Sequence, residues 1–269
     1  MKKTVLLAKK KDLDPVKTFE CGQCFRWNMD DKGDYYGVVG AHAARVFIDG
    51  EDVYIESDTD ELWSEYFDLA TDYAAITDAF HVSEYMDECI EFGYGIRLLR
   101  QDRWEALCSF IISQCNNIPR IKGIVERLCQ NFGDKISFEG RDYYTFPTAE
   151  RIAALSEEDL APIRSGYRAA YIISAARAVA EGRVDLEALS QTDCDASLRA
   201  LKSLNGVGTK VANCANLFGL GHMEAFPIDV WMKRALKEHF PKDFDPKTLG
   251  SYAGLAQQYI FYYARSGEN

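Results

Sequence analysis

Hydrophobic and polar residues follow one pattern up to about residue 95 and a different pattern after it. In the first part, short β-rich or alternating segments are separated by turns with Asp and Gly at 30–33 and 49–50. This pattern predicts an antiparallel sheet with flanking helices. Strands are expected at 18–27, 34–39, 44–48 and 53–55, and helices at 61–80 and 83–91.

After residue 95, apolar residues recur at helical spacing. Trp104, Leu107 and Ile111, for example, fall on one face of a helix expected over 104–114, a pattern typical of core helices. Further helices are expected at 118–132, 148–155, 157–163, 168–181, 185–189, 196–203, 209–217 and 251–265. We therefore expect an α+β fold, with an N-terminal antiparallel β-sheet domain and flanking helices over 1–94 and a mostly α-helical region over 95–269.

Composition indicates a globular protein and excludes general disorder, since 47% of the 269 residues are hydrophobic and 13% are aromatic. The apolar run at 4–8 ends at the lysines of 9–11 and is too short for a signal peptide. No stretch approaches the roughly 20 apolar residues of a membrane span. We expect a cytoplasmic protein that does not associate with membranes.

Eight cysteines are scattered along the chain, and reduced thiols are expected for most of them. Cys21 and Cys24 form a single CxxC pair with no second pair to complete a metal site, so no metal is expected there. The net charge of −11 is unusual for a DNA-binding protein. Residues 1–94, however, hold 9 Lys/Arg against 21 Asp/Glu, a balance of −12, whereas the remainder holds 22 against 21, a balance of +1. The second part can therefore bind phosphates through local contacts.

The candidate chemistry is concentrated between residues 204 and 231. A Gly206-Val207-Gly208 turn separates two expected helices, and the second helix, capped by Thr209, would present its first N–H groups to a phosphate. Lys210 and Cys214 are four apart and share a helix face, and Asp229 follows nineteen residues after Lys210. A solvated lysine and an ordinary N-cap aspartate are the structural alternatives for each residue taken alone. Together, an amine and a carboxylate beside a phosphate-binding turn suit attack on a sugar.

The stretch 204–214, with Pro227 and Asp229, resembles the signature of the helix–hairpin–helix (HhH-GPD) superfamily of base-excision DNA glycosylases. Within it, the chain resembles the 8-oxoguanine DNA glycosylase/AP lyase group. The likeness recurs in order at 22–27, 95–102, 116–121, 166–169 and 252–257. The resemblance implies a two-lobed glycosylase core after the sheet domain, with its hairpin at 196–217.

The resemblance implies a bifunctional enzyme that flips 8-oxoguanine out of duplex DNA and excises it through a lysine Schiff base, then nicks the strand by β-elimination. Lys210 would be the nucleophile, and Asp229 would stabilise positive charge on the sugar. Gly22 would offer a carbonyl to the N7 proton that distinguishes oxidised guanine from guanine. Gln257 would pair with the Watson–Crick edge, while Phe261 and Cys214 would cover the faces of the base.

The resemblance also implies contacts with DNA around the lesion. Backbone amides at Gly206 and Gly208 would bind phosphate, and the hairpin carbonyls could hold a monovalent cation. The residues expected to fill the gap or contact the opposite base, with a preference for cytosine, are Cys115, Asn116, Asn117, Arg120, Tyr167 and Arg168. The chain departs from the family at Cys115, where relatives usually have asparagine, and at Trp231, where they often have histidine.

The expected partner is double-stranded DNA containing oxidised guanine, bound by a monomer without a redox cofactor or nucleotide. The cysteine loop that holds an iron–sulfur cluster in some relatives is missing. Two alternatives remain: a same-fold glycosylase for alkylated bases or mismatched adenine, and a non-catalytic DNA-damage-binding module. Monofunctional glycosylases usually lack a lysine at position 210, and a binding module needs neither Lys210 nor Asp229.

Overall fold

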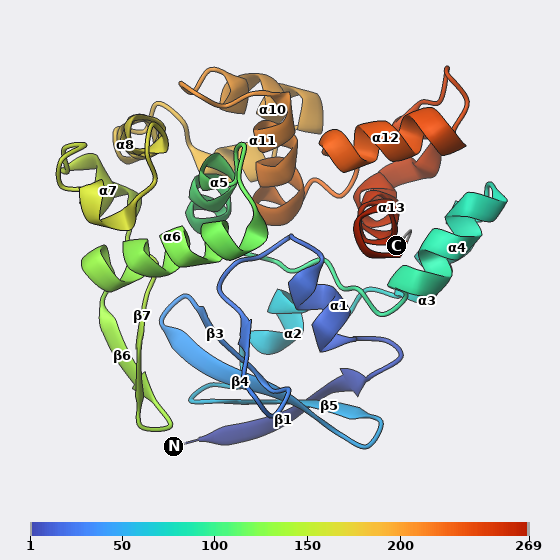
Figure 1. Ribbon diagram of the computed structural model, residues 1–269, viewed down its shortest axis with the longest axis horizontal. Coiled ribbons are helices and arrows are strands. Elements are labelled where there is room, and N and C mark those ends of the chain that lie inside the picture. Colours follow the sequence, from blue (N-terminus) through green and yellow to red (C-terminus); the bar gives the residue numbers. More distant parts are fainter. Residues whose placement is uncertain (1, 268–269) are drawn as a thin grey trace.

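A five-stranded antiparallel sheet lies along one side of the molecule, and most of the helices lie on the other side (Figure 1). The computed structural model describes residues 2–267. The strand order is β1-β5-β4-β3-β2. The strands are β1 (Lys3–Lys9), β2 (Asn28–Met29), β3 (Tyr35–Val39), β4 (His42–Asp49) and β5 (Asp52–Ser57). The expected α+β fold with an N-terminal antiparallel sheet is confirmed.

The β4–β5 hairpin follows directly from the sequence. Residues of β5 alternate between half-buried and buried positions, as expected when one face of a sheet covers a core. Asp49 pairs with Asp52, so the connection is a two-residue turn. Gly50 in this turn has φ 61°, a conformation that glycine adopts without steric cost.

The prediction of a strand over 18–27 is wrong. The chain instead forms helix α1 (Pro15–Glu20) and then an irregular loop up to β2. Asp14 starts the helix, because its carboxylate accepts hydrogen bonds from the backbone N–H groups of Val16 and Lys17 at 2.9 and 3.2 Å. Proline at the first helical position favours the same start.

A strand near the N-terminus and a separate two-stranded hairpin were not expected from the sequence. β1 runs through the short apolar segment near the N-terminus and pairs with β5 from Lys3↔Ser57 to Lys9↔Asp52. A separate hairpin pairs β6 (Lys135–Phe138) with β7 (Arg141–Tyr144), and Figure 1 shows it extending from α6 towards the sheet.

The single helix expected over 61–80 is divided into α2 (Trp63–Tyr66), α3 (Tyr73–Thr77) and the 3-10 helix η1 (Asp78–Phe80). Asp68 interrupts it with φ 51°, and Asp72 caps α3 by accepting a bond from Ala75 N at 3.1 Å. The remaining helices are α4 (Glu84–Gly93), α5 (Arg103–Ile112), α6 (Ile118–Phe132), α7 (Ala149–Ala153), η2 (Ala161–Ile163), α8 (Arg168–Ala180), α9 (Leu186–Ser190), α10 (Cys194–Lys202), α11 (Thr209–Ala215), the π-helix η3 (Asn216–Leu220), α12 (Val230–His239), η4 (Pro246–Tyr252) and α13 (Ala253–Ser266).

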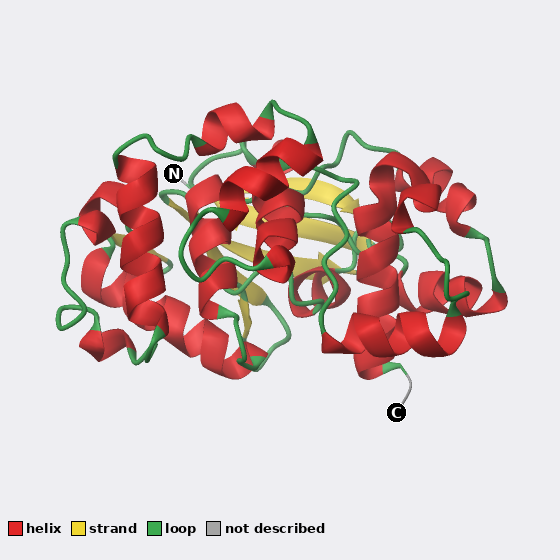
Figure 2. Ribbon diagram, turned by 90° about the horizontal axis from the view of Figure 1, so that it is seen from above, coloured by secondary structure: helices red, strands yellow, loops and turns green. Residues whose placement is uncertain are grey.

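The helices gather in two groups, with the strands visible between them in Figure 2. One group contains α5 to α11, and the other contains α12, α13 and α4 (Figure 1). α4 precedes residue 95 but packs against α13, where a Cβ on Gly93 would lie 2.6 Å from Tyr259 Cδ1. The part before residue 95 therefore contributes a helix to the helical layer as well as the sheet. Among residues 2–267, no helix is both long and apolar enough to cross a membrane.

Candidate active site

The expected hairpin joins α10 to α11 through a turn at 203–208. Gly206 has φ 77°, and a Cβ there would lie 2.3 Å from the ring of Tyr171, so a larger residue would strain the turn. The N-cap of α11 is Gly208; the expectation that Thr209 caps it is wrong, because Thr209 is already helical. No side chain caps this end of α11. Its first backbone N–H groups are therefore open to an anion.

Lys210 lies in the first turn of α11 and is half-buried against α5. Its Nζ lies 3.3 Å from Ser113 Oγ and 5.3 Å from the centre of the Phe110 ring. The Ser113 hydroxyl donates to the Phe110 carbonyl at 2.8 Å, so its oxygen lone pairs can accept an N–H from the lysine. The amine is thus held by α5 and is not free in solvent.

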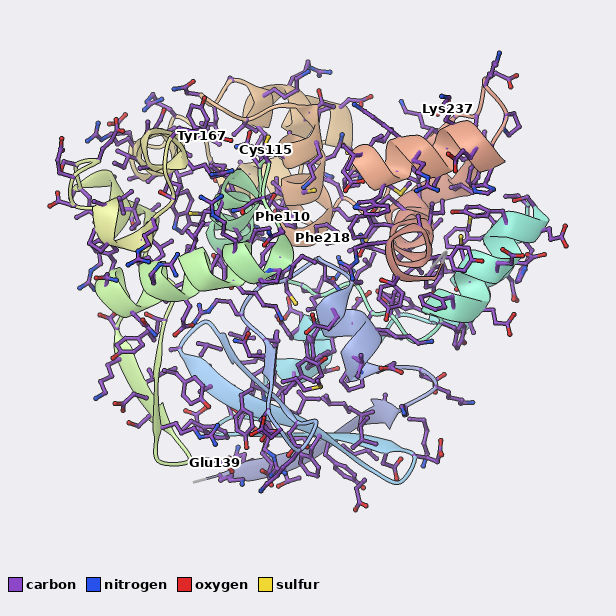
Figure 3. All side chains as sticks on the ribbon, in the orientation of Figure 1. Phe110, Cys115, Glu139, Tyr167, Phe218 and Lys237 are labelled. Carbon is purple, nitrogen blue, oxygen red and sulfur yellow. The ribbon has the colours of Figure 1, made fainter. Side chains whose placement is uncertain are left out.

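A cavity of about 40 Å³ lies beside this amine. Figure 3 shows two of its lining side chains, Phe110 and Phe218, close together near the centre of the molecule, and their ring centroids are 5.2 Å apart. The cavity is much smaller than the roughly 300–1,000 Å³ of typical ligand sites, so a purine could enter only after side chains move. The lining brings together all six of the expected catalytic and base-binding residues: Lys210, Asp229, Gly22, Cys214, Gln257 and Phe261.

Gly22 was expected to lie in a strand or bulge. It lies instead in the loop after α1 and reaches the cavity from there. Its φ is 82°, and a Cβ at this position would lie 3.2 Å from Phe261 Cε1. The neighbouring Gln23 holds the loop, because its buried amide donates to the carbonyls of Thr18 and Arg97 at 2.9 and 2.8 Å. The backbone at Gly22 is therefore fixed against the face of α13.

Asp229 is the N-cap of α12, and its Oδ1 accepts a bond from Met232 N at 2.9 Å. The bond fixes the Asp229 side chain at the start of α12. Burial raises the pKa of the Cys214 thiol; the charge and hydrogen bond of Lys210 oppose this rise, and the Asp229 charge adds to it. Cys214 therefore presents a neutral thiol to the cavity.

Comparison with known proteins identifies the family to which the chain belongs. Residues 5–107 match the 8-oxoguanine DNA glycosylase N-terminal domain, and residues 108–249 match the HhH-GPD superfamily of base excision DNA repair proteins. The chain is 32% identical over 265 residues to an N-glycosylase/DNA lyase of Saccharomyces cerevisiae, covering 87% of this chain and 70% of that protein. The chain belongs to the 8-oxoguanine DNA glycosylase group of the HhH-GPD superfamily.

Solved structures of similar proteins extend the match to nearly the whole chain. MBOgg1 in complex with a low-affinity DNA ligand superposes with a TM-score of 0.92 and 38% identity, over 100% of this chain and 96% of that one. The 8-oxoguanine glycosylase/lyase of Clostridium acetobutylicum, in complex with duplex DNA that has cytosine opposite 8-oxoguanine, gives a TM-score of 0.89 and 35% identity over 96% of this chain and 94% of that one.

The DNA-contacting loop expected in this glycosylase lies between α5 and α6, outside the cavity lining. Cys115 is exposed and has φ 47°, a left-handed conformation that asparagine, the usual residue of relatives, tolerates better than most. Asn116 Nδ2 donates to Ile112 O at 3.2 Å, and Asn117 caps α6 by accepting from Arg120 N at 3.0 Å. The Arg120 side chain is exposed.

Arg168, which is expected to contact the opposite base, lies in a buried position. Only 3% of it is exposed. Its guanidinium donates to Gln114 O at 2.9 Å and to the carbonyls of Cys115 and Ser165 at 3.2 Å. In this structure Arg168 therefore holds the loop that carries Cys115. Its neighbour Tyr167 is 55% exposed, and Figure 3 shows Tyr167 and Cys115 on the same half of the helical layer.

Four cavity residues were not assigned a role from the sequence: Phe110, Phe218, Pro227 and Gln258. Phe110 belonged to an apolar helix that looked like ordinary core, and it does stack on Phe218 within the core. Gln258 follows the predicted Gln257 and is equally buried, at 3% exposure. Its adjacency to Gln257 was the only sequence signal that pointed to it.

Three residues outside the cavity lining have side chains of the kinds that bind metal ions. The ligand atoms of Cys194, His222 and Glu224 lie within 4.8 Å of one another. His222 Nε2 lies 3.0 Å from Leu189 O, which leaves the other ring nitrogen as the available ligand. The CxxC cysteines, in contrast, are both buried, and burial raises the pKa of each thiol.

Proposed function

We propose that this chain is a bifunctional DNA glycosylase/AP lyase that removes 8-oxoguanine from duplex DNA, with Lys210 as the nucleophile. The observation that carries the proposal is the cavity in which the Lys210 amine meets Gly22, Gln257 and Phe261, which come from distant parts of the chain. A DNA-damage-binding module would not need an amine at the edge of such a cavity. A monofunctional glycosylase, which uses water, would not need one either.

The reaction begins when the neutral Lys210 amine attacks C1′ of the flipped nucleotide. The bond between C1′ and the base breaks, its electron pair leaves with the base, and the base takes up the proton that the attacking amine loses. The Phe110 ring beside Nζ excludes water from one side of the amine. Asp229, held by Met232 N, stabilises the positive charge that develops on the sugar.

The lyase step follows from the covalent intermediate. The C1′–O4′ bond opens to give a Schiff base between Lys210 and the sugar. Loss of a proton from C2′ then expels the 3′ phosphate by β-elimination, which nicks the strand. These steps need neither a redox cofactor nor a nucleotide.

Recognition of the base rests on the cavity lining. The Gly22 carbonyl accepts the N7 proton of 8-oxoguanine, whereas guanine would present a lone pair and be repelled. Gln257 pairs with the Watson–Crick edge, and Phe261 and the neutral Cys214 thiol cover the faces of the base. All four residues line one cavity beside Lys210.

The partner is double-stranded DNA containing oxidised guanine. The uncapped N-terminus of α11 binds a phosphate through backbone amides, which suits an enzyme that searches DNA without reading its sequence. We also propose a monovalent cation at the hairpin carbonyls, the loop from Cys115 to Asn117 as the segment that fills the gap, and a monomeric enzyme. A cytoplasmic location agrees with the buried free thiols of Cys108 and Cys129.

Borohydride trapping on a duplex with one 8-oxoguanine opposite cytosine tests the proposal. The unmodified protein should form a covalent protein–DNA adduct, and Lys210→Gln should form none while retaining its melting temperature. The exposed Lys202 on the preceding helix provides a matched control, since Lys202→Gln should trap as well as the unmodified protein. An adduct that persists in Lys210→Gln would refute Lys210 as the nucleophile. Excision without any adduct would refute the lyase mechanism.

A further inference from the structure

A second glutamine lies in the cavity beside the residue expected to read the base. Gln257 and Gln258 are adjacent on α13, and both line the cavity. Gln258 Nε2 donates to Gln257 Oε1 at 2.9 Å. Adjacent helical residues do not normally face each other, so the side chains must turn toward one another to form this bond. In this arrangement the bond occupies the Gln257 oxygen and leaves its Nε2 as a donor for a ligand.

The other end of the Gln258 amide has no partner. Its Oε1 is buried from solvent and accepts no hydrogen bond. Other buried side-chain atoms without a hydrogen-bond partner occur among residues 2–267, but their residues do not line this cavity. A buried acceptor without a donor destabilises a folded protein, so such atoms are rare and require an explanation. In a cavity that receives a ligand, the explanation is that the ligand supplies the donor.

We propose that Gln257 and Gln258 form one recognition unit for the base, in which Gln258 orients the Gln257 amide and accepts an N–H from the base through its own Oε1. This inference rests on the proposed function, because it concerns the base that enters the same cavity. It adds Gln258, whose side chain would touch the substrate, to the residues that determine specificity.

The unit presents a donor, Gln257 Nε2, next to an acceptor, Gln258 Oε1. The complementary edge has a carbonyl acceptor beside a ring N–H, which is the Watson–Crick edge of a guanine-type base. An adenine-type base has an amino donor beside a ring acceptor. Its amino group would face the donor Gln257 Nε2, and its ring nitrogen would face the acceptor Gln258 Oε1. The pair therefore selects oxidised purines of the guanine type and rejects those of the adenine type.

Equilibrium binding in a Lys210→Gln parent tests this inference without turnover. Three duplexes that differ at one position are used: 8-oxoguanine, guanine, and a tetrahydrofuran analogue of the abasic site. Gln258→Met, which keeps the side-chain length and removes both polar atoms, should weaken binding to the 8-oxoguanine duplex by about tenfold, the effect of losing one or two hydrogen bonds. Binding to the tetrahydrofuran duplex, which has no base, should change less than twofold.

The outcomes separate this inference from the proposed function. If the parent does not prefer 8-oxoguanine to guanine, the proposed function is wrong and the inference falls with it. If the parent has this preference and Gln258→Met retains it, only the inference is overturned. An equal loss on the 8-oxoguanine and tetrahydrofuran duplexes would show a structural role and would also overturn it.

A double-mutant cycle tests whether the two glutamines act together. The losses caused by Gln257→Met and Gln258→Met should not multiply in the double variant, because each one disrupts the same unit. Fully multiplicative losses would overturn the pairing. If Gln258→Met does not fold, Gln258→Glu takes its place. It keeps an acceptor but cannot donate to Gln257, so it should also lose the preference for 8-oxoguanine, and retention of that preference would count against the unit.

Discussion

A largely buried carboxyl on α5, the helix that packs against the lysine-bearing helix α11 of the candidate active site, makes the stability of this glycosylase dependent on pH. The Glu105 side chain is only 13% exposed, and the Arg26 guanidinium lies 3.5 Å away. Burial raises the pKa of Glu105 from 4.5 to about 7, an effect that Arg26 opposes and the charge of Asp102 increases. The folded chain therefore keeps a proton that the unfolded chain releases.

The sign of the effect follows from proton linkage. The folded state binds more protons than the unfolded state between pH 4.5 and about 7. The stabilising contribution of protonated Glu105 is complete below pH 4.5 and is lost as the pH rises through 7. Over this interval the loss amounts to about 3 kcal/mol. For a chain of this size that corresponds to roughly 6 to 12 °C in melting temperature.

The assay compares Glu105→Gln with the unmodified protein by thermal unfolding from pH 5 to pH 8. Glutamine has nearly the same shape but does not titrate, so the variant should gain stability relative to the unmodified protein as the pH rises. Glu150→Gln, at an exposed position on α7, is the matched control and should show no such trend. A difference between Glu105→Gln and the unmodified protein that stays constant with pH would refute the argument.

Two further variants test the loops around the cavity. Gly22→Ala would place a Cβ 3.2 Å from Phe261 and should slow excision of 8-oxoguanine at least tenfold; Gly40→Ala shares the positive φ but has open space and should leave excision unchanged. Equal excision rates in both variants would argue against close packing at Gly22. Arg168→Ala removes the guanidinium from the carbonyls of Gln114 and Cys115, and it should reduce discrimination among the four opposite bases. If cytosine keeps the same advantage in single-turnover excision, discrimination does not depend on the loop that Arg168 holds.

Much of the fold could be predicted from local patterns. The amphipathic segment 118–132 coincides with α6, because its apolar spacing and the Asn117 cap both act within a few residues. The two-residue turn at Gly50 was equally local. The start of α1 also has a local signal, the Asp14-Pro15 pair, which the prediction of a strand over 18–27 did not use.

Other elements depend on partners far along the chain. β1 is a short apolar segment that becomes a strand only because β5 supplies its hydrogen bonds, and no pattern within 3–9 shows this pairing. The same applies to the long helix expected over 61–80, which is broken at Asp68, where the carboxylate accepts a hydrogen bond from the Arg100 guanidinium at 3.1 Å. Tertiary contacts override weak local preferences in such segments.

For the candidate active site, the sequence by itself determined the chemical groups: an amine at Lys210, a carboxylate at Asp229 and an amide at Gln257, each within a recognisable motif. Only the tertiary structure decided their surroundings. In the folded chain, Arg168 is bonded to the backbone of the loop at Cys115, and Ser113 Oγ lies 3.3 Å from the Lys210 amine. The side chains of Gln257 and Gln258 are hydrogen-bonded to each other. The physical reason is that a motif specifies residue types at fixed spacing. Burial and hydrogen-bond partners, in contrast, depend on which distant segments pack together.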